Sequence, residues 1–159
     1  MTPKTVRESK SELTELALPN DANGLGNLLG GKLMHLMDIA GSLAASRHAR
    51  AHVVTASFDH MNFLAPVKIG QLVLLYSSVN RAFRTSMEVG VKAFVEDLRT
   101  GERKHVGSAY LTFVALDEHR QPVAVPPVIP ETEDEKRRYE QAGLRRAYRL
   151  ESLGRRPNE

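Results

Sequence analysis

The residues best suited to chemistry lie close together between Asp21 and Asp38. Asn23 stands in the tetrapeptide DANG, and Asp38 interrupts the apolar run LMHLMDIAG. A carboxylate among apolar side chains is costly unless it is paired or functional. Poor solvation makes a carboxylate hold a proton more readily, which suits a general base. A structural aspartate that caps a loop or pairs with an arginine is the alternative.

A glycine pair, Gly30 and Gly31, is the second component. It stands where a helix is predicted to begin, and the first N–H groups of a helix have no partner within it and carry a partial positive charge. Because glycine lets a substrate approach the backbone closely, this pair can hold the oxyanion of an attacked carbonyl. A tight junction between loop and helix, with no chemical role, is the alternative.

The spacing of Gly30 and Asp38 limits how they can act together. Eight residues along one helix separate them by about 12 Å, so one carbonyl cannot touch both. If both act on one substrate, the helix start must come from one subunit and Asp38 from the other. This spacing predicts an active site between two copies of the chain.

The elements that must position these residues are one long helix and several strands. Residues 28–48 carry apolar side chains on nearly all sides, which is typical of a buried helix. Gly30, Gly31 and Gly41 would weaken an isolated helix, so we expect close packing against its backbone. Apolar and β-branched runs predict strands at residues 5–18, 52–63, 72–79, 86–95 and 105–115. The sequence RTGE at residues 99–102 is typical of a hairpin turn.

This element order predicts an α+β fold, in which an antiparallel sheet wraps around one long central helix. We expect a single domain at residues 1–130, followed at residues 131–159 by a C-terminal helix and a basic tail. A helix that is apolar on all sides also needs cover where the sheet leaves it open. A second copy of the chain is the simplest cover, so at least a dimer is predicted.

Composition excludes several classes of protein. The 159 residues suit one domain, and the absence of cysteine excludes disulfides and thiolate metal sites. His48, His52 and His60 form no spaced ligand set with acidic residues, so no metal is expected. The net charge of +3 is too small to indicate nucleic-acid binding by itself. No apolar run is long enough to span a membrane and no signal peptide is evident, so we expect a cytoplasmic protein with no membrane partner.

Basic residues dominate the C-terminal region. Between Lys136 and Arg156 there are eight basic residues and two glutamates. A solvated helix or tail is one interpretation. A tail that contacts phosphate groups is the other.

Four segments, in order, resemble the acyl-CoA hydrolases of the hot-dog superfamily, and most closely the bacterial single-domain enzymes related to the brain acyl-CoA hydrolase. The segments are PNDANGLGNLLGG, the helix KLMHLMDIAGSLAASRHA, VVTASFDHMNFLAPVKIGQ and FRTSMEVGV, within roughly residues 10–117. The resemblance implies the hot-dog fold and hydrolysis of acyl-CoA to free CoA and a carboxylic acid. It also implies no cofactor, because CoA belongs to the substrate.

The resemblance implies roles for the residues already singled out. The family pairs an asparagine before the helix with an aspartate inside it, from opposite subunits, and these fall on Asn23 and Asp38. Asp38 would activate water, Asn23 would orient the thioester or the water, and the N–H of Gly30 or Gly31 would stabilise the oxyanion. A hexamer built as a trimer of dimers is the assembly that the family implies.

The resemblance also implies contacts to CoA. The segment FRTS places Arg84, Thr85 and Ser86 among them, although ordinary strand surface is the alternative for the two hydroxyl residues. Arg137 and Arg138 are weaker candidates for the CoA phosphates. The family often reads FLRPV where this chain has Ala65 in place of arginine, which puts a phosphate contact there in doubt.

Two rival functions stay open. A hot-dog dehydratase or hydratase acting on acyl thioesters usually relies on an Asp-His pair. His35, three residues before Asp38, shares a helix face with it and could form such a pair, or could be a core histidine. A non-catalytic protein that binds or senses acyl-CoA is the second rival. No Gly-x-Ser-x-Gly motif is present, which argues against a serine-type thioesterase.

Overall fold

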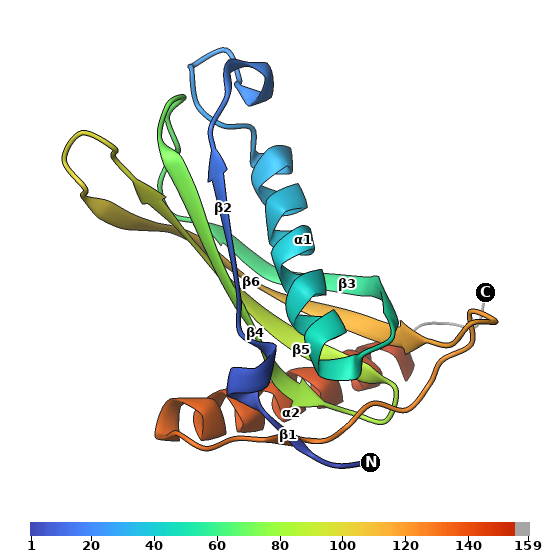
Figure 1. Cartoon of the computed structure of the whole chain (residues 1–159). Helices are drawn as coiled ribbons and strands as arrows, with labels where there is room; N and C mark the ends of the chain where they lie inside the picture. The colour runs from blue at the N-terminus through green and yellow to red at the C-terminus, as the bar shows by residue number, and fades with distance from the viewer. Residues whose placement is uncertain (155–159) are drawn as a thin grey trace.

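The structure, a computed structural model, describes residues 1–154, so Arg155 and Arg156 of the predicted basic tail lie outside the described residues. The elements in chain order are β1 (Lys4–Thr5), a 3-10 turn (Val6–Ser9), β2 (Ser11–Leu16), a second 3-10 turn (Pro19–Asp21), α1 (Gly30–Ala49), β3 (His52–Phe63), β4 (Leu72–Ala82), β5 (Ser86–Glu96), β6 (Arg103–Leu116), β7 (Val128–Ile129) and α2 (Glu133–Gly154). Five strands form an antiparallel sheet in the order β2-β4-β5-β6-β3, and α1 lies across one face of it (Figure 1). The predicted α+β hot-dog architecture is therefore confirmed.

The N-terminal segment differs from the single strand predicted at residues 5–18. A 3-10 turn interrupts it, because the hydroxyl of Ser9 donates to the carbonyl of Val6 and also accepts the N–H of Val79. The short strand β1 before this turn pairs in parallel with β7, a strand that the proline-rich sequence did not predict. Two segments from opposite ends of the chain thus lie side by side.

The core lies between α1 and the sheet. Leu36, Met37 and Ala40 of α1 are almost fully buried, and they pack with inward-facing residues such as Val91 and Phe113. A Cβ at Gly41 would lie 3.0 Å from the Phe113 ring, which confirms the predicted close packing against the helix backbone. The helix ends at Arg50, which adopts left-handed backbone angles and returns its N–H to the carbonyl of Ser46.

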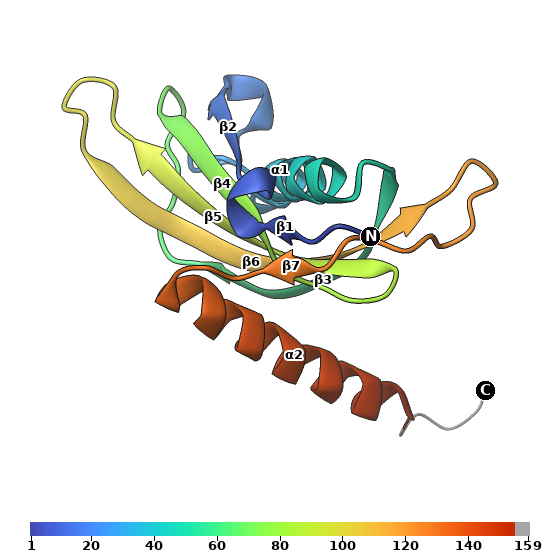
Figure 2. The ribbon, with the colours of Figure 1, turned by 60° about the horizontal axis from the view of Figure 1, so that its bottom comes forward.

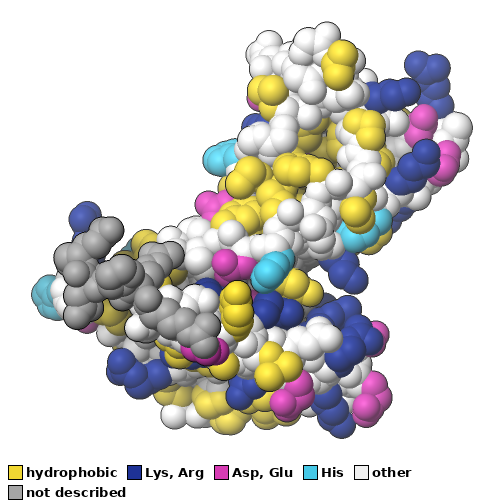
Figure 3. All heavy atoms as spheres, turned by 180° about the vertical axis from the view of Figure 1, so that it is seen from behind, with side chains coloured by type: hydrophobic (Ala, Val, Ile, Leu, Met, Phe, Trp, Pro, Cys, Tyr) yellow, Lys and Arg dark blue, Asp and Glu magenta, His cyan; other side chains and the backbone are white. Residues whose placement is uncertain are grey.

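The helix is not covered on all sides within one chain. Gly31 and His35 are exposed, and the apolar residues Met34 and Leu43 are 40% and 38% exposed. This open side lies next to β3, which is an edge strand of the sheet and, within residues 1–154, is paired with β6 alone. Figure 3 shows hydrophobic side chains gathered on one face of the molecule above the C-terminal helix. An uncovered apolar helix beside a 12-residue open edge is the geometry expected of an unpaired protomer.

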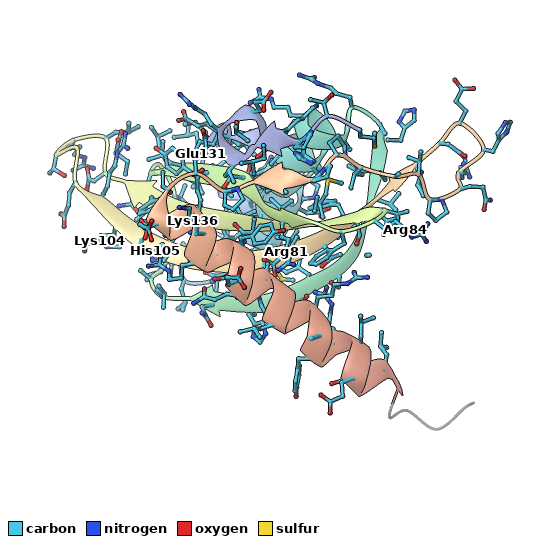
Figure 4. All side chains as sticks on the ribbon, turned by 90° about the horizontal axis from the view of Figure 1, so that it is seen from below. Arg81, Arg84, Lys104, His105, Glu131 and Lys136 are labelled. Carbon is cyan, nitrogen blue, oxygen red and sulfur yellow. The ribbon has the colours of Figure 1, made fainter. Side chains whose placement is uncertain are left out.

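The outer face of the sheet, opposite α1, carries α2 (Figure 2). Charged side chains hold this helix in place. Arg145 donates to both carboxylate oxygens of Glu88 at 2.6 and 2.9 Å, and Glu88 is 1% exposed. Arg81 of β4 lies between the sheet and α2 (Figure 4), with its guanidinium 4.1 Å from the centroid of the Tyr139 ring. The attachment of α2 thus rests on ion pairs and cation–π contacts more than on apolar burial.

Candidate active site

The start of α1 presents two unpaired backbone donors. Leu29 precedes the helix in an extended conformation, so Gly30 and Gly31 supply its first two N–H groups. The next two, from Lys32 and Leu33, both bond to the carbonyl of Leu29, whereas those of the glycines have no acceptor within residues 1–154. These donors sit at the positive end of the helix dipole, where a developing oxyanion is stabilised.

The two glycines differ in their surroundings. A Cβ at Gly30 would lie 3.3 Å from the tip of the Phe63 ring, whereas a Cβ at Gly31 would meet no atom within 4 Å. The backbone of Gly31 is therefore open to a ligand, while that of Gly30 lies under an aromatic side chain.

Asn23 and Gly30 line the same cavity, which has a volume of about 410 Å³. The side-chain oxygen of Asn23 accepts the N–H groups of Leu25 at 2.9 Å and Asn27 at 3.1 Å, which fixes the loop. The amide NH₂ of Asn23 has no acceptor within the described chain, so it is the group available to a ligand. Ala65, at the position where the resembling family often has arginine, lines this cavity too.

Asp38 lies on the open side of α1 and is half-buried in the single chain, less enclosed than its apolar neighbours suggested. Its Oδ1 accepts a hydrogen bond of 2.6 Å from the hydroxyl of Thr55, which belongs to β3. This contact orients the carboxylate and leaves Oδ2 free among residues 1–154. Asp38 therefore points toward the exposed edge of the sheet.

The role of Thr55 as a hydrogen-bond donor to Asp38 was not predicted from the sequence, although the strand pattern contained a clue to it. Residues of a strand alternate between its two faces, so the positions of β3 that face α1 can be listed once the strand is assigned. A threonine on the helix-facing side is a potential donor to Asp38. Because threonine is common in strands, its presence alone did not single it out.

His35 fulfils neither prediction made for it. It is exposed, so it is not a core histidine, and no hydrogen bond joins it to Asp38. Sharing a helix face did not bring the two side chains into contact.

The predicted CoA contacts lie far from Asn23 along the same chain. In the strand pairing, Ser86 lies opposite Val114 of β6, which in turn lies opposite Val54 of β3. Phe63, which contacts Gly30, lies opposite Gly107 of β6, which in turn lies opposite Ala93 of β5. Seven residues of β5 and seven of β6 separate these two levels, or about 23 Å, and β3 needs more residues for the same span because its register shifts twice. Arg84 is exposed at this far end, opposite Lys104 and His105 (Figure 4). The hydroxyl of Ser86 is buried and lies 3.5 Å from Arg146 of α2.

The two arginines at the start of α2 have different surroundings. Arg137 is exposed and pairs with Asp134 at 3.1 Å, a contact between residues three apart on one helix. Arg138 is half-buried and lines a second cavity on the outer face of the sheet. Neither residue lies with Asn23, Gly30 or Asp38 in one chain. Among residues 1–154, no group of three or more His, Asp or Glu side chains is placed to hold a metal ion.

Comparison with known proteins identifies the family. The thioesterase superfamily model matches residues 25–102. The uncharacterized acyl-CoA thioester hydrolase YkhA of Bacillus subtilis is 46% identical over 136 residues, which cover 84% of this chain and 79% of that protein. This chain belongs to the acyl-CoA thioester hydrolases of the thioesterase superfamily. The cytosolic acyl coenzyme A thioester hydrolase of Rattus norvegicus is 35% identical over 87% of this chain, which spans only 37% of that longer relative.

Solved structures of this family agree closely with the fold. A hexameric acyl-CoA thioesterase, solved without ligand, has a TM-score of 0.93 at 40% identity and covers 98% of this chain and 100% of its own. The acyl-CoA hydrolase of Staphylococcus aureus, solved with butyryl-CoA and CoA, has a TM-score of 0.85 at 37% identity, with 95% of this chain and 94% of that one covered. Alanine variants of the latter replace an asparagine, an aspartate and a threonine, whose order and spacing match Asn23, Asp38 and Thr55. No helix within the described residues is both long and apolar enough to cross a membrane.

Proposed function

We propose that this chain hydrolyses acyl-CoA to free CoA and a carboxylic acid. The observation that carries the proposal is the pair of unpaired N–H groups of Gly30 and Gly31, which open a helix beside the cavity that Asn23 lines. A thioester carbonyl oxygen placed there would accept hydrogen bonds that strengthen as it becomes an oxyanion. Membership of the acyl-CoA thioester hydrolases supports the same reaction.

The active unit is a dimer that pairs two β3 strands antiparallel around a two-fold axis. The open edge of β3 and the exposed side of α1 lie together, and Asp38 is on that side. An isologous interface there would cover both and bring the start of one α1 toward its partner's Asp38. It would also carry the Arg84 end of one sheet toward the Asn23 end of the other, which supports Arg84 and Thr85 as CoA contacts.

The proposed chemistry needs no covalent intermediate. Asp38 of one subunit takes a proton from water while the water oxygen bonds to the thioester carbon. The carbonyl oxygen becomes an oxyanion held by Gly30 and Gly31 of the partner subunit, and the NH₂ group of Asn23 holds the substrate. The carbon–sulfur bond then breaks to give the carboxylic acid, and the proton held by Asp38 passes to the CoA thiolate, which restores the carboxylate of Asp38. Thr55 acts as a positioning residue for Asp38.

A trimer of such dimers is the assembly we expect, by analogy with the hexameric relative. We expect a cytoplasmic location, since the rat relative is described as cytosolic. A dehydratase is less well supported, because its Asp-His pair has no counterpart in the separated Asp38 and His35.

Free thiol release from a series of acyl-CoAs, from two to eighteen carbons, tests the proposal. Asp38→Asn should lower kcat by about 10²–10⁴-fold, because a general base is lost. Its affinity for CoA, measured by calorimetry, should be retained, and His35→Gln should turn over normally. If the wild-type chain bound CoA but released no thiol at any chain length, a binding protein would be the better description.

A further inference from the structure

A cavity of about 370 Å³ lies on the outer face of the sheet, beside the start of α2. Three of its lining residues are paired neighbours across strands β4, β5 and β6 of the sheet, namely Tyr76, Lys92 and Ser108. The next position along β4, Ser77, faces the other way and donates its hydroxyl to the carbonyl of Ala40 in α1. Since successive side chains point to opposite faces, the thickness of the sheet separates this cavity from the proposed active site.

The rim of this outer cavity is cationic. Lys10, Lys92 and Arg138 line it, and none of the three has a carboxylate partner within residues 1–154. Glu12 is the single carboxylate among the lining residues, and it is exposed. Three cations against one anion favour a negatively charged ligand.

The floor of the cavity is hollow and polar. Gly90 lies at its centre, level with Ser78 on one side and Tyr110 on the other. A Cβ at Gly90 would lie 3.1 Å from the side chain of Asn80, which is 3% exposed and donates its NH₂ to Glu88 at 3.0 Å. The side-chain oxygens of Ser78, Asn80 and Tyr110 form no hydrogen bond within the described chain, so three polar groups face one space without partners.

We propose that this outer cavity binds a phosphate ester of a polyhydroxylated ring, such as a sugar phosphate or a nucleoside monophosphate. The guanidinium of Arg138 and the amines of Lys10 and Lys92 would hold the phosphate, because charge-assisted hydrogen bonds to phosphate are the strong ones. The floor of Ser78, Asn80 and Tyr110 would bond to the hydroxyl groups of the ring. The volume lies within the range of small-molecule sites. This site is independent of the proposed hydrolysis, which uses the other face of the sheet.

Calorimetric titration of the full chain with ribose 5-phosphate and with AMP tests the proposal, with ribose and inorganic phosphate as partial ligands. At least one phosphate ester should bind more tightly than either partial ligand. The double substitution Lys92→Gln and Arg138→Gln should weaken that binding by at least about tenfold. Arg137→Gln is the matched control, because it removes the neighbouring arginine outside the cavity, and it should leave the affinity unchanged. Circular dichroism should show that each variant is folded.

A competition experiment separates the outer cavity from the CoA site. Saturating CoA should not displace the phosphate ester, and Arg84→Gln should not alter its affinity. Displacement by CoA would overturn the proposal, because the ligand would then occupy the substrate site. Absence of binding by all probes would overturn it too. A change in oligomer mass of the double variant would then identify the outer face as a contact between copies.

Discussion

The hydroxyl of Thr55 lies 2.6 Å from the carboxylate of Asp38, and this hydrogen bond joins the edge strand β3 to the open side of α1. Any partner that pairs with β3 must therefore approach the carboxylate. The positions of the proposed base and of the proposed interface are coupled through one hydrogen bond.

Removing that hydrogen bond should lower catalysis without unfolding the protein. Thr55→Val keeps the shape of the side chain but loses the donor, so Asp38 gains rotational freedom. We expect kcat to fall about tenfold, since a hydrogen bond to a charged group contributes about 1.5–3 kcal/mol. Thr55→Ser should restore most of the rate because it restores the donor. A Thr55→Val enzyme with wild-type kcat would show that the contact is only structural.

Mixing two inactive variants should restore activity if the site spans two subunits. Asn23→Ala and Asp38→Asn each damage a different half of the site. In a mixed dimer, one site carries both substitutions and the other carries neither. Random mixing should therefore recover about a quarter of wild-type turnover, because half of the dimers are mixed and each holds one intact site. Co-expression with two different affinity tags isolates the mixed dimer. No recovery in that sample would mean that Asn23 and Asp38 act within one chain.

The glycine pair offers a comparison between two adjacent positions. Gly31→Ala meets no neighbouring atom, so the variant should fold with an unchanged or slightly higher melting temperature, because alanine favours the helix. Its methyl group would nevertheless occupy the space of the substrate carbonyl, so kcat/KM should fall at least about tenfold. Gly30→Ala presses on the Phe63 ring and should lose stability as well. Full activity of Gly31→Ala would remove that N–H from the proposed oxyanion site.

The ion pair under α2 should contribute strongly to stability. The hydrogen bonds that Arg145 donates to Glu88 raise the pKa of Arg145, so the guanidinium stays charged. Arg145→Met would leave the buried carboxylate of Glu88 with the Asn80 amide as its one remaining partner among the described residues, at a cost of about 3–5 kcal/mol. Arg137→Met, which breaks an exposed pair on the same helix, should change the free energy of unfolding by less than about 0.5 kcal/mol. Urea denaturation of both variants checks the difference, and equal effects would contradict this account of α2.

The free energy of unfolding should decrease at acidic pH because of His48. Its Nε2 donates to the carbonyl of Pro126 at 2.6 Å, and its Nδ1 is buried with no partner within residues 1–154. Burial lowers the pKa of His48 below its ordinary value of 6.5, although the Pro126 hydrogen bond and Glu8 oppose the shift and Lys4 adds to it. As pH falls below 6.5, the unfolded chain binds a proton that the native state resists, so the free energy of unfolding decreases.

Urea midpoints at pH 7.5 and pH 5.0 measure this effect. The decrease should be smaller in His48→Gln than in the wild type, whereas His119→Gln, in an exposed turn, should behave as the wild type does. The same decrease in all three proteins would assign the acid sensitivity to other groups.

Much of the architecture could be predicted because the pattern was strong. The apolar character of residues 28–48 predicted a helix where α1 lies at Gly30–Ala49, and the C-terminal helix expected within residues 131–159 corresponds to α2 at Glu133–Gly154. The 3-10 turn after Thr5 was missed because the side chain of Ser9, and not a periodic pattern, creates it. The two-residue strand β7 is shorter than any alternation that a sequence can display.

The candidate site was only partly accessible from sequence. The loop and the helix start were predicted because glycine and asparagine have specific local roles. The contact between Thr55 and Asp38, and the distance of Arg84 from Asn23, depend on how strands are paired, which residue types do not reveal. The prediction for His35 was wrong for a different reason. His35 and Asp38 share a helix face, but the helix spacing does not determine the direction of the side chains, and His35 is exposed.

The parallel pairing of β1 with β7 has a consequence for biosynthesis. The N–H of Lys4 bonds to the carbonyl of Pro127 at 3.0 Å, so this hydrogen bond cannot form until Pro127 has been translated. During translation β1 cannot pair with β7 until Val128 and Ile129 have left the ribosome. A nascent chain stalled before that point would lack the β1–β7 pairing even if the hairpins of β4, β5 and β6 had already formed, and the backbone of β1 would be open to proteases and chaperones.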